Sequence, residues 1–290
     1  MNYKITALIS AITESFFNLT LDIAVNRINK YRVLLYTSII SGFFQIIYSL
    51  FIGINFSIAS IPIIIIYGVC VLIGYVAFVK AIQYLPADLV VLIGTGQMFV
   101  VFLIDSIFGN IKLTPTFVML FILFVVSVIW FIIETNKIKS KIYFKNIKLI
   151  GVVFALITVL ISSVTPYIIK LASNMGANEI AINLGYYVIA IPFFFIMVKG
   201  IKEKAQTEDN SYKNKFVLLI VLIGILESIY YPLYTFSYTG GSAFIVTVVT
   251  ELRIFLLVIL SAIFKTDKIN WQKAIAMLMG IAAVTGLCLL

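Results

Sequence analysis

The sequence has 290 residues, of which 62% are hydrophobic and only 11% are charged. A soluble domain is about 45–50% apolar and about 25% charged, and a disordered chain needs low hydrophobicity and high net charge. The composition therefore predicts an integral membrane protein. The net charge of +9 lies in short basic clusters between apolar runs, a pattern typical of polytopic membrane proteins rather than of nucleic-acid binding.

The apolar runs predict ten membrane-spanning helices, because one helix needs roughly 20 apolar residues to cross the hydrocarbon core. In chain order the spans are residues 4–21, 34–53, 61–83, 87–107, 114–133, 149–171, 179–198, 216–237, 242–264 and 271–290. Runs such as 61–66 are apolar on every face, whereas barrel strands alternate apolar and polar residues. The first run lacks a small-residue cleavage pattern, so we expect a retained span rather than a signal peptide. The fold class is thus an all-α integral membrane protein.

The residue types exclude several kinds of site. There is no histidine, so metal sites, catalytic triads and proton relays that use histidine are impossible. Cys70 and Cys288 lie inside apolar runs, which argues against a disulfide framework or a metal site. There is no phosphate-binding loop, and Asp88 and Asp105 lie near opposite ends of one span, too far apart for a catalytic pair. We expect no enzymatic activity, no cofactor and no metal.

The two halves of the chain resemble each other weakly. Residues 87–120 align with residues 243–276, and the alignment pairs Ala87 with Ala243, Ile107 and Phe108 with Ile263 and Phe264, and Lys112 with Lys268. We therefore predict two five-helix repeats, residues 1–140 and 141–290, in one membrane domain. Since five is odd, the repeats are inverted relative to each other, and the substrate site of such proteins lies at the interface of the repeats.

The basic residues predict the orientation. Seventeen of the 21 lie after odd-numbered spans, chiefly in the loops 22–33, 134–148, 199–215 and 265–273. The positive-inside rule places these loops in the cytoplasm and, with ten spans, both termini outside. We expect a multi-pass protein of the cell membrane.

Short motifs at the ends of the spans carry a resemblance to a known family. They are Tyr84-Leu85-Pro86-Ala87 with Ile107-Phe108-Gly109-Asn110-Ile111-Lys112-Leu113, and Tyr238-Thr239-Gly240-Gly241 with Phe264-Lys265-Thr266-Asp267-Lys268-Ile269. In this arrangement the chain resembles the drug/metabolite transporter superfamily, and within it the EamA-type transporters with ten helices. The resemblance implies a central cavity, alternating access and a small-molecule substrate of open identity, for which amino acids, sugars, nucleotide sugars, choline and organic cations are the candidates. Many members carry a glutamate at the turn where this chain has Asn110 and Ile111.

Four ionisable residues lie deep within the spans: Glu14, Glu227, Glu251 and Arg253. A charge at mid-bilayer costs at least about 2.5–3.5 kcal/mol on insertion scales, so such residues are candidates for function. Glu14 shares a helical face with Asn18. The resemblance extends to a glutamate on the first helix of the small multidrug-resistance branch, which binds protons and cationic substrates in turn. A protonated carboxyl bonded to a neighbouring helix is an equally weighted interpretation of Glu14.

Glu227 begins a polar stripe that continues with Tyr230, Tyr231 and Tyr234 at helical spacing. Aromatic faces and one carboxylate are the usual receptor for choline-like cations, and each cation–π contact contributes about 0.5–2 kcal/mol. Tyr186 and Tyr187 on the seventh span are predicted to supply the facing wall. Packing or interfacial tyrosines are the alternative interpretation.

Glu251 and Arg253 are two residues apart, so on one helix they point to different faces and do not readily pair. Arg253 is predicted to pair with a carboxylate on another helix or to meet an anionic group of the substrate. Pro166 and Pro232 lie inside spans, where each frees a carbonyl and forms either a static bend or a hinge.

These observations predict a secondary transporter of a small polar metabolite that works by alternating access. An organic cation is slightly preferred as substrate, with Glu14 and Glu227 as candidates for proton coupling. The alternatives are an exporter or facilitator of amino acids or other metabolites and, from another class, a channel or a scaffold subunit. The expected partners are the substrate and the lipid bilayer, with no nucleic acid, and the protein is a monomer or a homodimer.

Overall fold

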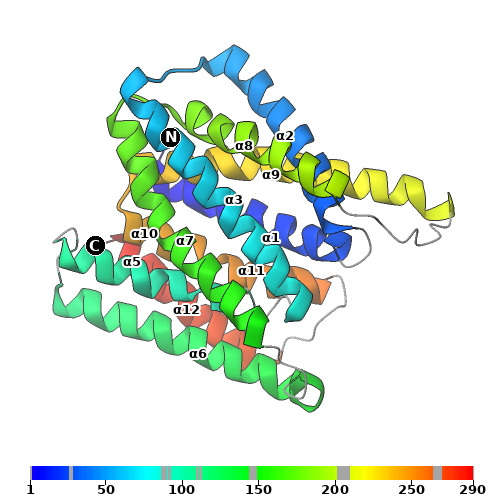
Figure 1. The fold of residues 1–290 in the computed structure, drawn as a ribbon. Helices are drawn as coiled ribbons and strands as arrows, with labels where there is room; N and C mark the ends of the chain where they lie inside the picture. Colours follow the sequence, from blue (N-terminus) through cyan, green and yellow to red (C-terminus); the bar gives the residue numbers. More distant parts are fainter. Residues whose placement is uncertain are drawn as a thin grey trace.

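The computed structural model describes residues 2–25, 29–85, 90, 93–108, 111, 113–143, 149–200, 210–263 and 270–289. All regular secondary structure in these segments is helical (Figure 1), as the composition predicts. The turn residues 109, 110, 112 and 264–269 of the family motifs, and the basic residues at 26–28, 144–148 and 201–209, lie outside the described residues.

Within the described segments, seven helices are long and apolar enough to cross a membrane. They are α1 (Tyr3–Val25), α2 (Lys30–Ile52), α3 (Ile61–Tyr84) with the short 3₁₀ helix η1 (Ile58–Ser60) before it, α7 (Leu149–Asn174), α8 (Glu179–Gly200), α9 (Asn210–Gly240) and α12 (Trp271–Leu289). Large apolar side chains such as Leu50, Leu218 and Leu278 are exposed on their outer faces, as contact with lipid requires. The protein is therefore a multi-pass membrane protein.

The predicted span 242–264 is not one helix. It consists of α10 (Ala243–Thr250) and α11 (Arg253–Ile263), which meet at a turn over Glu251 and Leu252. At this turn the Leu252 and Ile254 amides donate to carbonyls three residues back instead of four. The β-branched run Ile245–Thr250 has low helix propensity, which weakens the helix just before the break.

The predicted span 87–107 is broken in a similar way. The helix α5 (Gly96–Ile107) begins after a turn at Thr95, where Gly94 and Gly96 flank the turn and lower the local helix propensity. The next helix, α6 (Pro115–Tyr143), runs further than predicted and includes most of the connection 134–148. The boundary at residues 140 and 141 therefore falls inside α6.

Helices distant in sequence pack side by side (Figure 1). The packed pairs that position the site are α1 with α9 and with α10 and α11, α3 with α7 and α8, α2 with α8 and α9, α5 with α7 and α10, and α6 with α12. Tyr3 packs on Gly240 at one end of the bundle, and Tyr84 packs on Gly151 at the other. We call these the Tyr3 end and the Tyr84 end.

Two glutamines satisfy the carbonyls that prolines leave without an intrahelical donor. Pro166 in α7 frees the Ser162 carbonyl, which accepts a hydrogen bond from Gln97 Nε2 at 3.1 Å. Pro232 in α9 frees the Ser228 carbonyl, which accepts from Gln45 Nε2 at 2.9 Å. The helix segment at each proline is therefore tied to a neighbouring helix.

Replacing Gln45 by leucine is expected to destabilise the protein by about 1 kcal/mol, because the Ser228 carbonyl then lacks a donor in a buried site. In a Pro232→Ala background the same replacement should cost much less, because alanine restores a backbone amide at this position that can donate to that carbonyl. Thermal unfolding of the four proteins of this cycle measures the difference. If Gln45→Leu destabilised the protein equally in both backgrounds, this would contradict the role of Gln45 as donor to the Ser228 carbonyl.

Candidate functional site

The interior of the bundle contains a polar cavity. It is lined by α1, α3, α5, α7, α9 and the first residue of α11, together with Val90 and Gly94 before α5. The volume that the centre of a water molecule can occupy inside the cavity is about 120 Å³. This is room for on the order of ten such molecules, since one needs roughly 10–15 Å³ by this measure. The cavity therefore has the size of a small metabolite.

Aromatic rings form one wall of the cavity. Tyr230, Tyr231 and Tyr234 line it from α9, and Tyr67 and Tyr75 line it from α3. Phe17 of α1 stacks on Tyr230 with the ring centroids 6.1 Å apart. We call the five tyrosines the tyrosine wall. Aromatic faces that line a cavity favour a cationic or aromatic ligand.

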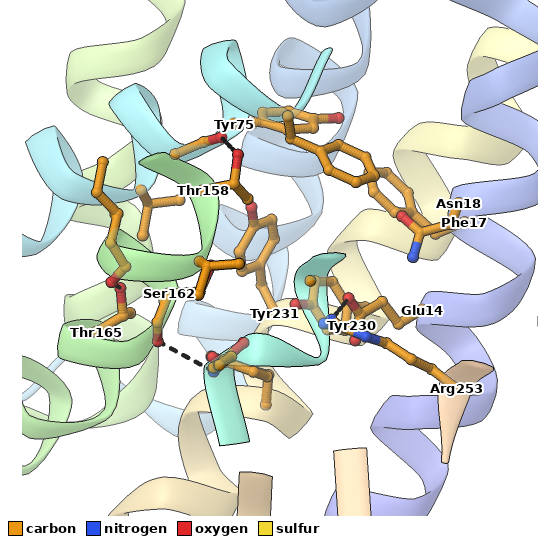
Figure 2. A pocket seen from close by; sticks show the side chains of 18 of the residues that line it. Glu14, Phe17, Asn18, Tyr75, Thr158, Ser162, Thr165, Tyr230, Tyr231 and Arg253 are labelled. Atoms are coloured by element: carbon orange, nitrogen blue, oxygen red, sulfur yellow. Dashed lines mark hydrogen bonds and ion pairs between the residues drawn. The ribbon is translucent and has the colours of Figure 1, made fainter. Parts of the chain in front are cut away.

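An ion network lies beside the tyrosine wall. Arg253 Nη1 donates to Glu14 Oε1, and Arg253 Nη2 donates to Glu251 Oε1 at 3.1 Å. Figure 2 shows the Glu14 carboxylate and the Arg253 guanidinium meeting next to Tyr230. The expectation that Glu251 and Arg253 do not pair is wrong. Because the helix breaks between them, their side chains are no longer held at the helical angle that separates residues two apart.

At the cavity, two polar atoms of the network have no hydrogen-bond partner among the described residues. Glu14 and Arg253 line the cavity, and the atoms Glu14 Oε2 and Arg253 Nε are buried without a hydrogen-bond partner. Buried polar atoms in folded proteins are nearly always bonded, so unbonded ones beside a cavity indicate a place for a ligand or water. Ser15 Oγ also donates to the Arg253 carbonyl at 3.2 Å, which ties α1 to the helix break.

Hydroxyl groups line the side of the cavity away from Glu14 and Arg253. They belong to Thr158, Ser162 and Thr165 of α7 (Figure 2). Gln97 of α5 lines the cavity as well. These α7 residues are not among the site residues predicted from the sequence. The sequence feature that could have indicated them is the spacing of polar residues at 158, 162 and 165, which places them on one helical face of an otherwise apolar span.

The structure brings six of the ten predicted site residues to the cavity: Glu14, Asn18, Tyr230, Tyr231, Tyr234 and Arg253. Glu251 reaches the site only through Arg253. Tyr186, Tyr187 and Glu227 are buried but do not line the cavity. The Tyr187 hydroxyl lies 2.6 Å from Ser41 Oγ, on the side of α8 that packs on α2. Tyr186, Tyr187 and Tyr231 interact with Glu227, but this carboxyl group does not line the cavity, where the carboxylate is Glu14.

Hydrogen bonds join the helices beyond the cavity at the Tyr3 end. Asp105 of α5 accepts hydrogen bonds from the Tyr167 hydroxyl at 2.9 Å and from the Phe244 amide at 3.0 Å. Near it the Tyr238 hydroxyl lies 3.0 Å from Thr247 Oγ1. In the other direction the cavity extends to Phe78, Val90 and Ala155, toward the Tyr84 end.

Fold and cavity together define a polytopic helical membrane protein with a polar internal site. The model of the EamA-like transporter family matches residues 149–289, which confirms the resemblance seen in the sequence. No curated protein matches the sequence. Among 27 matching chains of solved structures, one crystal structure of a protein without a stated function covers 99% of this chain and 96% of its own. It has a TM-score of 0.74 and 14% identity, a likeness of fold alone.

Proposed function

We propose that this protein is a secondary transporter that carries a small polar metabolite across the cell membrane by alternating access. The observation that carries this proposal is the polar cavity inside a bundle of membrane-spanning helices, with Glu14 and Arg253 on its surface. Ionisable side chains at such depth are costly in lipid and mark substrate pathways. The match of the EamA-like transporter family to the second half of the chain supports the same function.

The packing supports an architecture of ten helices in two inverted repeats, residues 1–140 and 141–290. In this scheme α1, α2, α3, α5 and α6 correspond to α7, α8, α9, α10 with α11, and α12. If each helix is replaced by its counterpart in the other repeat, the packed pair α1 and α9 becomes α7 and α3, which also pack together. In the same way the packed pair α2 and α9 becomes the packed pair α8 and α3. The pairs α2 with α8, α5 with α10 and α6 with α12 map onto themselves.

The two helix breaks support the repeat independently. In the alignment of residues 87–120 with 243–276, Thr95 corresponds to Glu251 and Gln97 to Arg253. The turns before α5 and between α10 and α11 lie at these positions. Both Gln97 and Arg253 line the cavity. Discontinuous helices that meet at the interface of inverted repeats are a recurrent way of building a substrate site in transporters.

The structure corresponds to a state that faces the cytoplasm in this proposal. Lys30 and Lys80 lie at the Tyr84 end, where Lys30 donates to Gln83 Oε1. The positive-inside rule assigns this end, and the loops 22–33, 134–148, 199–215 and 265–273, to the cytoplasm, with both termini outside. The hydrogen bonds of Asp105 then close the outer side.

Asp105→Asn is expected to open the outer side more often, because an amide cannot accept both hydrogen bonds as a carboxylate does. If the closed outer side loses about 1.5 kcal/mol of stabilisation, the equilibrium between the closed and open states of that side shifts roughly tenfold toward the open state. The measurement is the labelling rate of Ser162→Cys by an impermeant thiol reagent added outside, with Cys70 and Cys288 replaced by alanine. Thr239→Ala, whose hydroxyl bonds within its own helix, is the control. An unchanged labelling rate in Asp105→Asn would contradict the closing role.

A small organic ammonium compound is the substrate that the cavity favours. Its cationic group can replace Arg253 as the partner of Glu14 and contact the tyrosine wall, which preserves the preference for a choline-like cation with Glu14 in place of Glu227. A specific observation favours amino acids as the second candidate, because Arg253 lines the same cavity and can bind a carboxylate. Proton coupling through Glu14 is part of this proposal.

A binding screen tests the proposed site. Purified protein is heated in the presence of choline, polyamines, amino acids, sugars or nucleotides, since a ligand that binds only the folded state raises the unfolding temperature. We expect stabilisation by an ammonium compound that is weakened in Tyr230→Ala and preserved in Tyr36→Ala, an exposed tyrosine outside the cavity. Stabilisation by none of these classes would contradict a metabolite site and leave the channel or scaffold alternatives.

A further inference from the structure

A second buried polar cluster lies behind the tyrosine wall. Glu227 of α9 has no exposed surface, and the Thr37 side chain of α2 faces its carboxyl group. Tyr75 of α3 and Tyr186 of α8 interact electrostatically with Glu227, and Ser38 of α2 interacts with Tyr186. The five side chains come from four helices, and the cluster does not belong to the cavity except through Tyr75.

The oxygens of this cluster are unsatisfied to an unusual degree. Five of them are buried without a hydrogen bond of good geometry: both carboxyl oxygens of Glu227, Ser38 Oγ, Tyr75 OH and Tyr186 OH. Their nearest polar neighbours are within the cluster, since Thr37 faces Glu227 and Tyr75, and Ser38 faces Tyr186. Buried polar atoms are bonded in the large majority of cases, and an exception needs an explanation such as an ion or water between the groups. Here the exceptions are gathered around one carboxyl group.

Among the described residues, no positively charged side chain pairs with this carboxyl group. Glu14 is held by Arg253, whereas no cationic side chain interacts with Glu227 in the part of the chain that the structure describes. The titratable groups that face it are tyrosines, namely Tyr75 from α3, Tyr186 and Tyr187 from α8 and Tyr231 from α9 itself. A carboxylate that is buried without a cation, and with only the Thr37 hydroxyl as a neighbouring donor, is costly, so the site favours a positively charged occupant.

We propose that Glu227, Thr37, Ser38, Tyr75 and Tyr186 form a binding site for a small monovalent cation, Na⁺ or H⁺, separate from the substrate cavity. A donor set made only of oxygens suits a hard cation, and carboxylate with hydroxyl oxygens is a chemistry for Na⁺ or for a proton shared with the carboxylate. No cysteine, histidine or methionine belongs to the set, so softer metal ions have no ligand here.

Tyr75 connects this cation site to the substrate cavity. Its side chain lines the cavity and also faces Glu227, and Tyr231 does the same from α9. A cation that fixes these rings therefore changes the wall that the substrate contacts, and by linkage the substrate changes the affinity for the cation. This coupling rests on the proposed transport function, whereas the binding of the cation does not.

The test is the thermal unfolding of the purified full-length protein without any substrate. Na⁺ is varied against K⁺ at constant ionic strength, and pH is varied separately at constant Na⁺. The wild type should be stabilised either by Na⁺ over K⁺ or by acidification, and Glu227→Gln should lose that response. Glu179→Gln, which changes a carboxyl group in the first turn of α8, should keep it. The first response identifies Na⁺ as the ligand and the second identifies H⁺.

A wild type that responds to neither cation would overturn the proposal and indicate a trapped water only. An unchanged response in Glu227→Gln would also overturn it. If Glu227→Gln does not fold, Ser38→Ala and Tyr186→Phe should raise the apparent dissociation constant about tenfold, as loss of a group supporting an ion does. Tyr238→Phe, whose hydroxyl bonds to Thr247, serves as their control and should leave the constant unchanged. Because no transport is measured, failure of this site and failure of the transport function are distinguishable.

Discussion

Replacing Arg253 by methionine is expected to destabilise the protein by about 3–5 kcal/mol, the usual cost of removing one partner from a buried ion network. Glu14 and Glu251 both depend on this guanidinium and are both buried. Without it, two carboxyl groups remain close together in a site with little water. Thermal unfolding of the purified variant measures the effect, and a lower yield of folded protein in the membrane is expected with it.

The carboxyl partners provide the control for this prediction. Combining Arg253→Met with Glu14→Gln and Glu251→Gln removes the unpaired charges and should restore most of the lost stability, because a neutral polar group costs much less to bury than a charge. The restored protein should still fail to transport. If Arg253→Met alone is as stable as the wild type, the network does not support the fold. If the triple variant is no more stable than Arg253→Met, the loss has another cause.

Glu14→Gln is expected to weaken substrate binding at least tenfold, whereas Glu251→Gln should leave it within about threefold. Both residues are buried, both bond to Arg253 and both have a second carboxyl oxygen without a partner, but only Glu14 lines the cavity. Loss of a hydrogen bond to a charged group costs about 1.5–3 kcal/mol, which corresponds to roughly tenfold to more than a hundredfold in affinity. Substrate titration in the binding screen measures both values.

The comparison of the two variants separates direct contact from support of Arg253. Equal losses in Glu14→Gln and Glu251→Gln would mean that both act by holding the guanidinium in place. Unchanged binding in Glu14→Gln would remove Glu14 from the substrate site. Asn18→Ala provides an additional comparison, since Asn18 lines the same part of the cavity on the next turn of α1.

The class of fold and most helices of this protein follow from its sequence, because apolar runs of about 20 residues are a strong signal for membrane helices. The break at Glu251 does not follow, since α10 and α11 together read as one apolar run. The pairing of Arg253 with both carboxylates depends on that break. Periodicity also places Glu227 on the face of Tyr230 and Tyr234. It does not show where along α9 the cavity ends. The cavity ends before it reaches Glu227, so this residue does not line it.

The most direct test of the central claim is counterflow in proteoliposomes that contain the purified protein and a ligand found in the binding screen. We predict saturable uptake of labelled ligand that unlabelled ligand inside accelerates and that is lost in Glu14→Gln but retained in Glu251→Gln. Ion conductance that does not saturate, or uptake equal to that of protein-free liposomes, would contradict a carrier with its substrate site at Glu14 and Arg253.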